Sequence, residues 1–308
     1  MIFVSVLFAY RAFLYTGIRK NKLGIYNKYN ELFQKKNNTY DVLFLGSSRA
    51  EMHFDPKIFD HITGLNSYNM GISGASPKIS LALLKTYCSQ HQKPKYLIYN
   101  LDYFSLQNDT DRLNDFPRYF PYLENKLLRN ELQKMDDRFT SFYYNPLHSL
   151  PYTQIEFLSA SLHGWLNIAG KYDTLMYKGF QTSALNTFNR SDEPHPKYSL
   201  ISVKNRKYID SLILFSAANN IRLMLVTSPV YGNGKLNTLN KNQLVNQLKS
   251  IASVNHVPYL NYTDSSIYKN PLLFADFFHL NRIGAREFSK SISFAFNNIS
   301  SGKTLFNK

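Results

Sequence analysis

The sequence predicts an α/β protein with three layers, in which helices cover both faces of a five-stranded parallel sheet. Short apolar runs that fit buried strands alternate with longer segments whose apolar residues recur every three to four positions, as in helices. This strand–helix alternation is typical of parallel sheets. The chain has 308 residues, of which 44% are hydrophobic, so it can hold one large α/β domain or two smaller ones.

The N-terminal segment 1–18 is apolar apart from Arg11 and a few small polar residues. It is about long enough to span a bilayer, and we predict a membrane anchor here. Arg11 near its middle would be costly in lipid unless its side chain snorkels to the interface. The alternative is an amphipathic helix that packs on the domain. No small-residue cleavage site comes after it, so the segment does not fit a cleavable signal peptide.

Residues 19–40 are mostly polar and predict a linker that contains a short helix. The linker begins with the basic cluster Arg19-Lys20-Asn21-Lys22. Because basic residues flanking an apolar span favour the cytoplasmic side, the cluster by itself favours a cytoplasmic location for the rest of the chain.

Three strands and two helices are predicted after the linker. The run 41–45 is apolar, too short for a helix, and succeeded by a glycine and two serines. A serine at the carboxyl end of a buried strand is how parallel α/β sheets expose a nucleophile. The next expected elements are a helix from Asp55-Pro56 to about His61, a strand at 67–70, a helix from Pro77 to about Gln90 and a strand at 96–101.

Segment 107–196 interrupts the alternation with aromatic–proline clusters, and we predict an insertion beside the active face rather than a separate folding domain. Helical segments are expected around 123–135 and 153–168. Its aromatic side chains either stack on sugar rings or pack the insertion against the core, and packing is the commoner use.

The alternation resumes after the insertion. The expected elements are a helix at 203–218, a strand at 221–227, a helix at 239–254, a short strand at 259–261 and a closing helix at 282–297. The closing helix has Ala285, Phe288, Ile292 and Phe296 on one face, which we expect to be buried. Residues 301–308 read as a frayed tail.

Asp276 and His279 lie in a short loop just before the closing helix. A serine hydroxyl is nearly inert at neutral pH, and an imidazole oriented by a carboxylate is a base that activates it. Ser48, His279 and Asp276 are therefore candidates for nucleophile, base and orienting carboxylate. Each has a plainer alternative: a turn serine, a surface histidine and, for Asp276, the cap of the closing helix.

Three blocks of the sequence together resemble the SGNH/GDSL hydrolase superfamily: Gly46-Ser47-Ser48, then Asn69-Met-Gly71-Ile-Ser-Gly74, then Asp276-x-x-His279. The Gly-Ser-Ser-Arg block in place of Gly-Asp-Ser is similar to a membrane-linked, envelope-type variant related to polysaccharide O-acetyltransferase and deacetylase domains. The resemblance implies one flavodoxin-like domain over 41–300 and an acyl-enzyme mechanism. It also implies an extracytoplasmic catalytic domain, opposite to what the basic cluster favours.

The resemblance further implies an oxyanion hole built from the backbone N–H groups of Ser48 and Gly74 and an asparagine side chain after the third strand. Asn100 is the nearest asparagine, but Asp102 stands two positions later in place of the family's Gly-x-Asn-Asp context. One missing donor can lower the rate about a hundredfold. Ser47, where the family has aspartate, is a second departure.

The expected function is therefore a serine esterase or O-acyltransferase acting on acylated cell-envelope carbohydrate through an acyl-enzyme on Ser48. The alternative is a non-catalytic carbohydrate-binding or envelope-assembly protein that keeps the fold. The expected partners are an acylated carbohydrate or small ester and, through the N-terminal helix, a membrane.

Other classes of site have little support in the sequence. The net charge is +15, but the lysines are dispersed and no nucleic-acid module is present. A lone cysteine, Cys88, excludes an internal disulfide. His53 and Asp55 lack a third metal ligand nearby and read as surface turn residues, so no metal or cofactor is expected. Arg49 would bind an anionic substrate or, more commonly, form a salt bridge. Gly302-Lys303-Thr304 lacks the upstream glycine of a P-loop.

Overall fold

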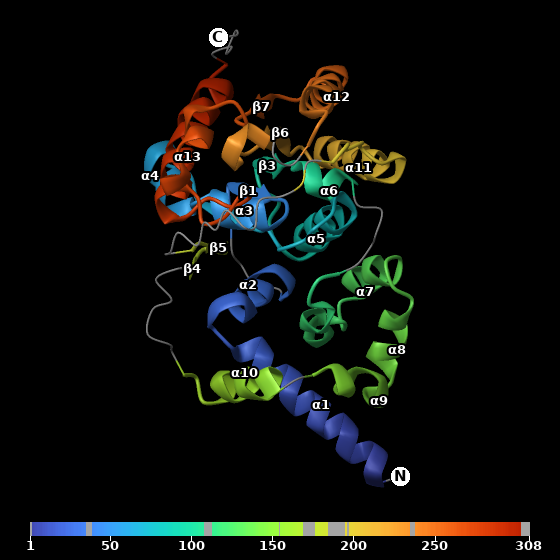
Figure 1. The fold of residues 1–308 in the computed structure, drawn as a ribbon. Helices are drawn as coiled ribbons and strands as arrows, with labels where there is room; N and C mark the ends of the chain where they lie inside the picture. The colour runs from blue at the N-terminus through green and yellow to red at the C-terminus, as the bar shows by residue number, and fades with distance from the viewer. Residues whose placement is uncertain are drawn as a thin grey trace. The chain divides into compact units, whose positions relative to one another are not determined.

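The computed structural model describes residues 2–34, 39–107, 113–153, 155–168, 176–183, 195, 197–234 and 238–302 (Figure 1). Parts of the predicted insertion (108–112, 154, 169–175, 184–194 and 196) and most of the predicted tail (303–308) lie outside these residues. The chain divides into two compact units. We call Met1–Asn38, Leu81–Gln92 and Thr110–Thr174 the helical unit, and Thr39–Ser80, Lys93–Asp109 and Leu175–Lys308 the sheet unit.

A five-stranded parallel sheet with the order β2-β1-β3-β6-β7 forms the centre of the sheet unit. Its strands are β1 (Val42–Leu45), β2 (Ser67–Asn69), β3 (Tyr96–Asn100), β6 (Arg222–Thr227) and β7 (Tyr259–Asn261). This order is that of doubly wound, flavodoxin-like sheets, so the predicted fold class is confirmed. A separate antiparallel pair, β4 (Met176–Tyr177) and β5 (Phe180–Gln181), lies in the same unit.

The strands are apolar because both faces of the sheet are covered. All four residues of β1 are fully buried, as expected for a parallel sheet between two helical layers. Phe44 of β1, Ile98 of β3 and Met224 of β6 are partners across the ladder and belong to one hydrophobic core. Alternate residues of each strand therefore face the same layer.

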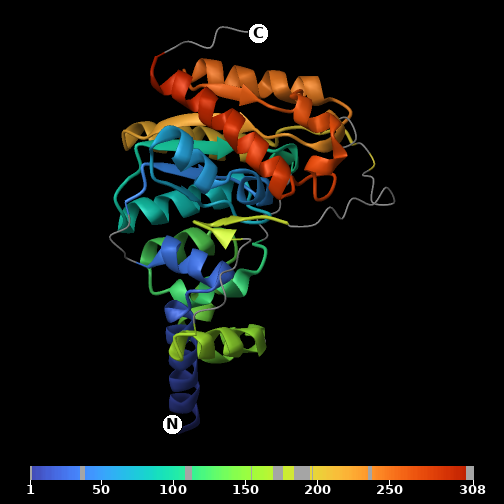
Figure 2. The same cartoon turned by 90° about the vertical axis from the view of Figure 1, so that its left-hand side faces the viewer.

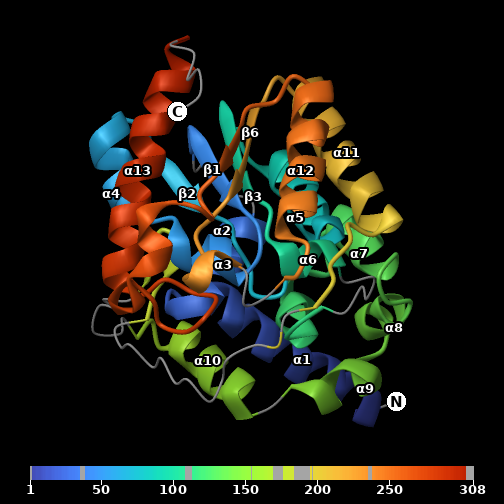
Figure 3. The same cartoon turned by 45° about the horizontal axis from the view of Figure 1, so that its top comes forward.

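Helices cover the two faces of the sheet: α13 and α4 lie on one side, and α11 and α12 on the other (Figure 3). The helices of this unit are α3 (Ser48–His53), α4 (Pro56–Thr63), α6 (Tyr103–Gln107), α11 (Val203–Ala218), α12 (Lys241–Val254) and α13 (Arg282–Ser300), with 3-10 turns η4 (Tyr231–Gly234), η5 (Ser266–Lys269) and η6 (Pro271–Leu273). The predicted apolar face of the closing helix is buried, as expected. Helix α5 (Pro77–Gln90) begins in the sheet unit and ends in the helical unit.

The helical unit consists of short helices packed around aromatic side chains. Its elements are α1 (Ile2–Lys20), α2 (Gly24–Phe33), η1 (Phe116–Tyr122), α7 (Lys126–Gln133), α8 (Arg138–Tyr144), α9 (Pro146–Ser149), η2 (Leu150–Tyr152) and α10 (Ile155–Trp165). The rings of Phe116, Phe120, Phe142 and Tyr152 pack against one another, so these side chains pack within the predicted insertion itself.

The N-terminal apolar helix is present as α1, and α10 crosses it (Figure 2). By length and composition α1 is able to cross a membrane. The next segment, predicted as a polar linker, contains α2, in which Tyr29, Leu32 and Phe33 are buried. Tyr29 and Phe33 pack on Tyr119, so this helix is part of the core of its unit.

Candidate active site

The carboxyl ends of the parallel strands lie at one edge of the sheet, and the serine block comes directly after β1 there. Gly46 has a φ of +144°, and a Cβ at this position would lie 2.8 Å from the backbone oxygen of Asn100. A glycine is therefore needed where β1 ends. The chain then enters α3 at Ser48, the one residue of 42–50 whose side chain is not fully buried.

Ser48, His279 and Asp276 form a chain of hydrogen-bonded side chains. The Oγ of Ser48 is 2.9 Å from Nε2 of His279. The Nδ1 of the same ring is 2.9 Å and 3.0 Å from the two carboxylate oxygens of Asp276. An ionised carboxylate only accepts hydrogen bonds, so Nδ1 carries the proton and Nε2 of the neutral ring is left to accept the hydroxyl of Ser48. The structure thus brings together the three residues that the sequence singled out.

The loop before α13 holds Asp276 in its orientation. Its Oδ1 accepts the backbone N–H groups of Phe278 (2.7 Å) and His279 (2.8 Å). Burial by itself would raise the pKa of the Asp276 carboxyl, but the hydrogen bond and charge of His279 together with these N–H groups lower it below the ordinary value. The side chain of Asn281 caps α13 by accepting from Ile283 and Gly284. The alternative of Asp276 as the helix cap is therefore wrong.

The second block is bonded to the middle and the C-terminal end of α3. The side chain of Asn69 donates to the backbone oxygens of Ala50 and Phe54, both at 2.8 Å, and accepts the N–H of Gly71. A Cβ at Gly71 would lie 2.4 Å from the backbone nitrogen of Glu51, so only glycine fits this approach. This packing determines how the loop carrying Gly74 sits beside the serine block.

Two of the three predicted oxyanion donors are backbone groups. Within the described residues, no atom accepts a hydrogen bond from the N–H of Ser48 or of Gly74, which has a φ of +72°. The third, Asn100, is 1% exposed, and its Oδ1 accepts the N–H of Ser228 at 3.0 Å. This bond leaves its Nδ2 as a buried donor with no partner in the described part of the chain. The assignment of Asn100 to the oxyanion hole stays a prediction.

His53 is not the surface turn residue that its sequence context predicts. Its side chain is fully buried, Nε2 accepts the N–H of Leu280 at 3.0 Å, and Nδ1 is 3.0 Å from Oγ of Ser228. Since Nε2 accepts from a backbone N–H, the proton must be on Nδ1, which donates to the Ser228 hydroxyl. Burial, the charge of Arg49 and the nearby His279 ring lower the pKa of His53 well below its ordinary value. In the sequence, only the position of His53 five residues after Ser48 indicates that it lies near the candidate site.

Arg49 points into the protein and not toward solvent. Its guanidinium donates to the backbone oxygens of Ser228 and, at 3.4 Å, of Pro229. Burial lowers the pKa of Arg49, and the carboxylate of Asp102 opposes this effect. Asp102 also accepts the hydroxyl of Ser47. The side chains of Arg49 and Asp102 thus join the ends of β1, β3 and β6. Because its guanidinium is buried in these contacts, Arg49 has no access to an anionic substrate.

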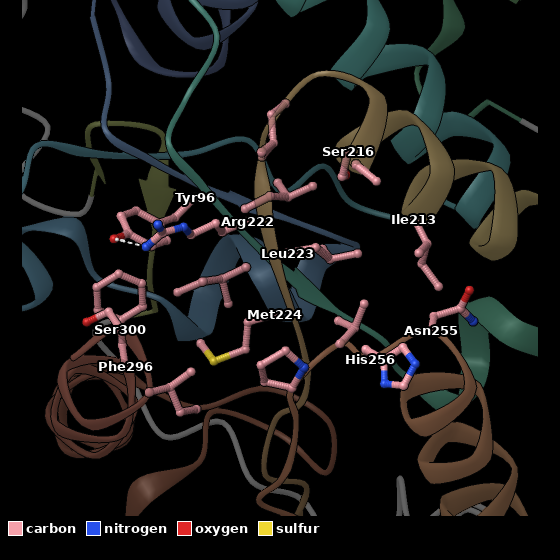
Figure 4. Close-up of a pocket in the computed structure, with 17 residues that line it drawn as sticks. Tyr96, Ile213, Ser216, Arg222, Leu223, Met224, Asn255, His256, Phe296 and Ser300 are labelled. Carbon is pink, nitrogen blue, oxygen red and sulfur yellow. Dashed lines mark hydrogen bonds between the residues drawn. The ribbon is translucent and has the colours of Figure 1, made fainter. Parts of the chain in front are cut away.

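A cavity of about 380 Å³ lies at the other end of the sheet, near the amino ends of β3 and β6 (Figure 4). Strand β7 pairs with β6 only from Leu225 onward, so the first half of β6 lies beside this cavity instead of beside a strand. Its one arginine, Arg222, donates to Tyr96 at 3.4 Å. The cavity is remote from the serine. Among the described residues, no group of three or more His, Cys, Asp or Glu side chains is placed to hold a metal ion.

Comparison with known proteins finds matches only among solved structures. No protein-family profile and no curated protein matches the sequence. One similar solved structure, from Bacteroides fragilis NCTC 9343 and assigned as an acylhydrolase, has 17% identity and a TM-score of 0.43 over 89% of this chain and 94% of its own. Another, from Desulfitobacterium hafniense DCB-2 and assigned as a lipolytic protein of the G-D-S-L family, has 9% identity and a TM-score of 0.43 over 83% and 99%.

Proposed function

We propose that this chain is a serine ester hydrolase of the SGNH/GDSL type, with Ser48 as nucleophile, His279 as general base and Asp276 as its orienting carboxylate. The single observation that carries the proposal is the continuous hydrogen-bond path from Ser48 Oγ through the His279 ring to Asp276. The three residues come from opposite ends of the chain, and an inert fold has no need to align them. The sheet order and the three sequence blocks support the same assignment.

In the acylation step, Ser48 Oγ attacks the carbonyl carbon of a bound ester while His279 Nε2 takes its proton. The negative charge on the carbonyl oxygen is stabilised by the N–H groups of Ser48 and Gly74, which have no other acceptor in the described residues. When the intermediate collapses, His279 returns the proton to the departing alcohol. The acyl group then remains on Ser48.

In the deacylation step, a second molecule attacks the acyl carbon while His279 removes its proton. The bond between the acyl carbon and Ser48 Oγ then breaks, and His279 returns the proton to Ser48. Water as the second molecule gives hydrolysis, and a sugar hydroxyl gives acyl transfer. The finer form of the proposal is esterase or O-acyltransferase action on acylated cell-envelope carbohydrate, together with attachment to a membrane through α1 and an extracytoplasmic sheet unit. Membrane attachment rests on the length and apolar composition of α1, and the other parts rest on the resemblance of the Gly-Ser-Ser-Arg block.

The experiment is covalent labelling of the folded full-length chain with a fluorophosphonate probe, which phosphonylates activated serines. We expect one labelled serine, with labelling abolished in Ser48→Ala and hydrolysis of p-nitrophenyl acetate lost in parallel. Ser73→Ala is the matched control because Ser73 is an exposed serine in the neighbouring loop. It should leave both signals unchanged.

A folded wild type that neither labels nor hydrolyses the ester contradicts the proposal and leaves the non-catalytic carbohydrate-binding alternative. Asn100→Ala separates two roles of the buried amide. If its Nδ2 serves the oxyanion, the labelling rate falls about a hundredfold or more. If the amide only joins β3 to Ser228, unfolding becomes easier while the labelling rate of the folded enzyme stays within about tenfold of wild type.

A further inference from the structure

Helix α10 in the helical unit is apolar on two opposite faces. Its inner face, formed by Phe157, Ala160, Ser161 and Gly164, is buried. Its outer face carries Ile155 and Leu162, which are 77% and 41% exposed, and continues into Leu166 at 68%. These outer residues are spaced by seven and four positions, so they share one side of the helix. An exposed apolar face on a helix whose opposite face is buried is a candidate contact surface for protein or lipid.

The inner face of α10 is fixed against α1 by a close crossing. A Cβ at Gly164 would lie 1.8 Å from the backbone oxygen of Gly17, so the two backbones touch. Trp165 Nε1 donates to the backbone oxygen of Phe13 at 3.0 Å. The side chain of Asn21 donates to Ala160 at 2.7 Å. With this side of α10 bonded to α1, the outer face has no freedom to turn inward.

Only the first turns of α1 project from the helical unit. Ile2–Tyr10 is exposed almost throughout, whereas Leu14–Ile18 is largely buried. Between them, Arg11 donates to the backbone oxygens of Phe142 (3.3 Å) and Tyr143 (2.8 Å). The projecting part is about 13 Å long at 1.5 Å per residue. The hydrocarbon core of a bilayer is about 30 Å thick, so this part is long enough to enter it.

The residues where the two helices cross are of the kinds found at membrane surfaces. Figures 1 and 2 both show α10 lying across α1, with the N-terminal turns of α1 projecting beyond it. Trp165, at the end of α10, stacks on Phe13 and lies 3.7 Å beneath the ammonium of Lys20. Tryptophan beside a basic residue is the pair that membrane proteins place at the lipid–water interface. Lys20 and Lys22 add positive charge here, against one carboxylate on α10, Glu156.

We propose that the helical unit docks on an anionic phospholipid bilayer, with Ile2–Tyr10 inserted in the lipid and the outer face of α10 in contact with lipid through Ile155, Leu162 and Leu166. The occupant of the outer face is lipid because the face is apolar, adjoins a projecting apolar helix and is flanked by basic residues in a chain of net charge +15. This inference concerns attachment and is independent of the esterase chemistry.

The test uses the full-length chain and flotation with phosphatidylcholine vesicles, with and without phosphatidylglycerol. Replacing Leu162→Asn together with Leu166→Asn should lower the vesicle partition coefficient at least about tenfold. The matched control is Leu214→Asn with Val254→Asn, two side chains on α11 and α12 that are 67% and 73% exposed. This pair should stay within about twofold of wild type. Equal loss in both pairs, or wild-type binding by the α10 pair, overturns the proposal.

A second measurement needs no substitution, because Trp165 is the only tryptophan of the chain. Its emission should shift to the blue when vesicles are added, and brominated lipids should quench it. Vesicle-bound protein whose tryptophan emission is unchanged would mean that α1 alone attaches the chain, which refutes the role of α10. Fluorophosphonate labelling in detergent tests the esterase separately, so either proposal can fail without the other.

Discussion

Replacement of His53 tests whether a buried histidine holds in place the loop that carries Asp276 and His279. His53 accepts the backbone N–H of Leu280, the residue directly after His279, and donates to Ser228. The two histidine rings are 6.3 Å apart between centroids. We therefore compare His53→Phe, which keeps an aromatic ring but removes both hydrogen bonds, with His53→Gln, whose side-chain oxygen is able to accept from Leu280.

The structure gives the expected magnitude for His53→Phe. Leu280 and Ser228 are both 0% exposed, so neither group gains water in the variant. A buried N–H left without an acceptor costs about 1–3 kcal/mol, and the lost bond to the hydroxyl about 0.5–1.5 kcal/mol. The free energy of unfolding should fall by about 1.5–4.5 kcal/mol in total. His53→Gln should recover about half of that loss because it restores the acceptor.

The assay combines urea unfolding with the rate of fluorophosphonate labelling under conditions where each variant is folded. A shift of the loop that carries Asp276 and His279 by a fraction of an ångström should slow labelling in His53→Phe by about 10- to 100-fold, with partial recovery in His53→Gln. Equal stability and labelling in His53→Phe and wild type would falsify the positioning role. If His53→Gln behaves like His53→Phe, the acceptor at Leu280 is not what matters.

The same contacts support three further predictions. The pKa of His53 is lowered well below 6.5, so below about pH 6.5 the unfolded chain binds a proton there that the folded chain does not, and stability falls with decreasing pH by up to about 1.4 kcal/mol per pH unit. In urea unfolding between pH 7 and 5, the free energy of unfolding of His53→Phe should therefore depend less on pH than that of wild type. An equal dependence on pH in both proteins contradicts the lowered pKa of His53. Asp276→Asn should slow labelling at least about 100-fold because the carboxylate orients the imidazole. It should change the free energy of unfolding by less than about 1 kcal/mol because the Asp276 side chain is 45% exposed. Labelling at the wild-type rate would exclude Asp276 from the triad. Gly71→Ala should lower the free energy of unfolding by about 1–3 kcal/mol because the added Cβ would meet the backbone of Glu51. Gly64→Ala has open space around the added Cβ but a φ of +72°, so it should lower the free energy of unfolding by about 1 kcal/mol. Thermal melting distinguishes the two variants, and the same loss at both sites would mean that the close approach at Gly71 relaxes.

The strands and the closing helix were predictable because their signals are local. Four consecutive apolar residues in β1 and the recurrence of Phe288, Ile292 and Phe296 in α13 show burial within a single element. The candidate triad was also predictable, since Ser48 and the Asp276–His279 pair stand in recognisable blocks. In these cases the residue types and their spacing carry the chemistry directly.

Tertiary structure decided the features that depend on contacts between distant segments. His53 looks like a polar turn residue in sequence, and it is buried only because Ser228, Leu280 and Phe288 pack around it from elsewhere in the chain. In the same way, segment 19–40 is polar overall, but Tyr29 and Phe33 find aromatic partners in η1, far along the chain. Composition reports what a side chain prefers, and only the fold determines which partners are within reach of it.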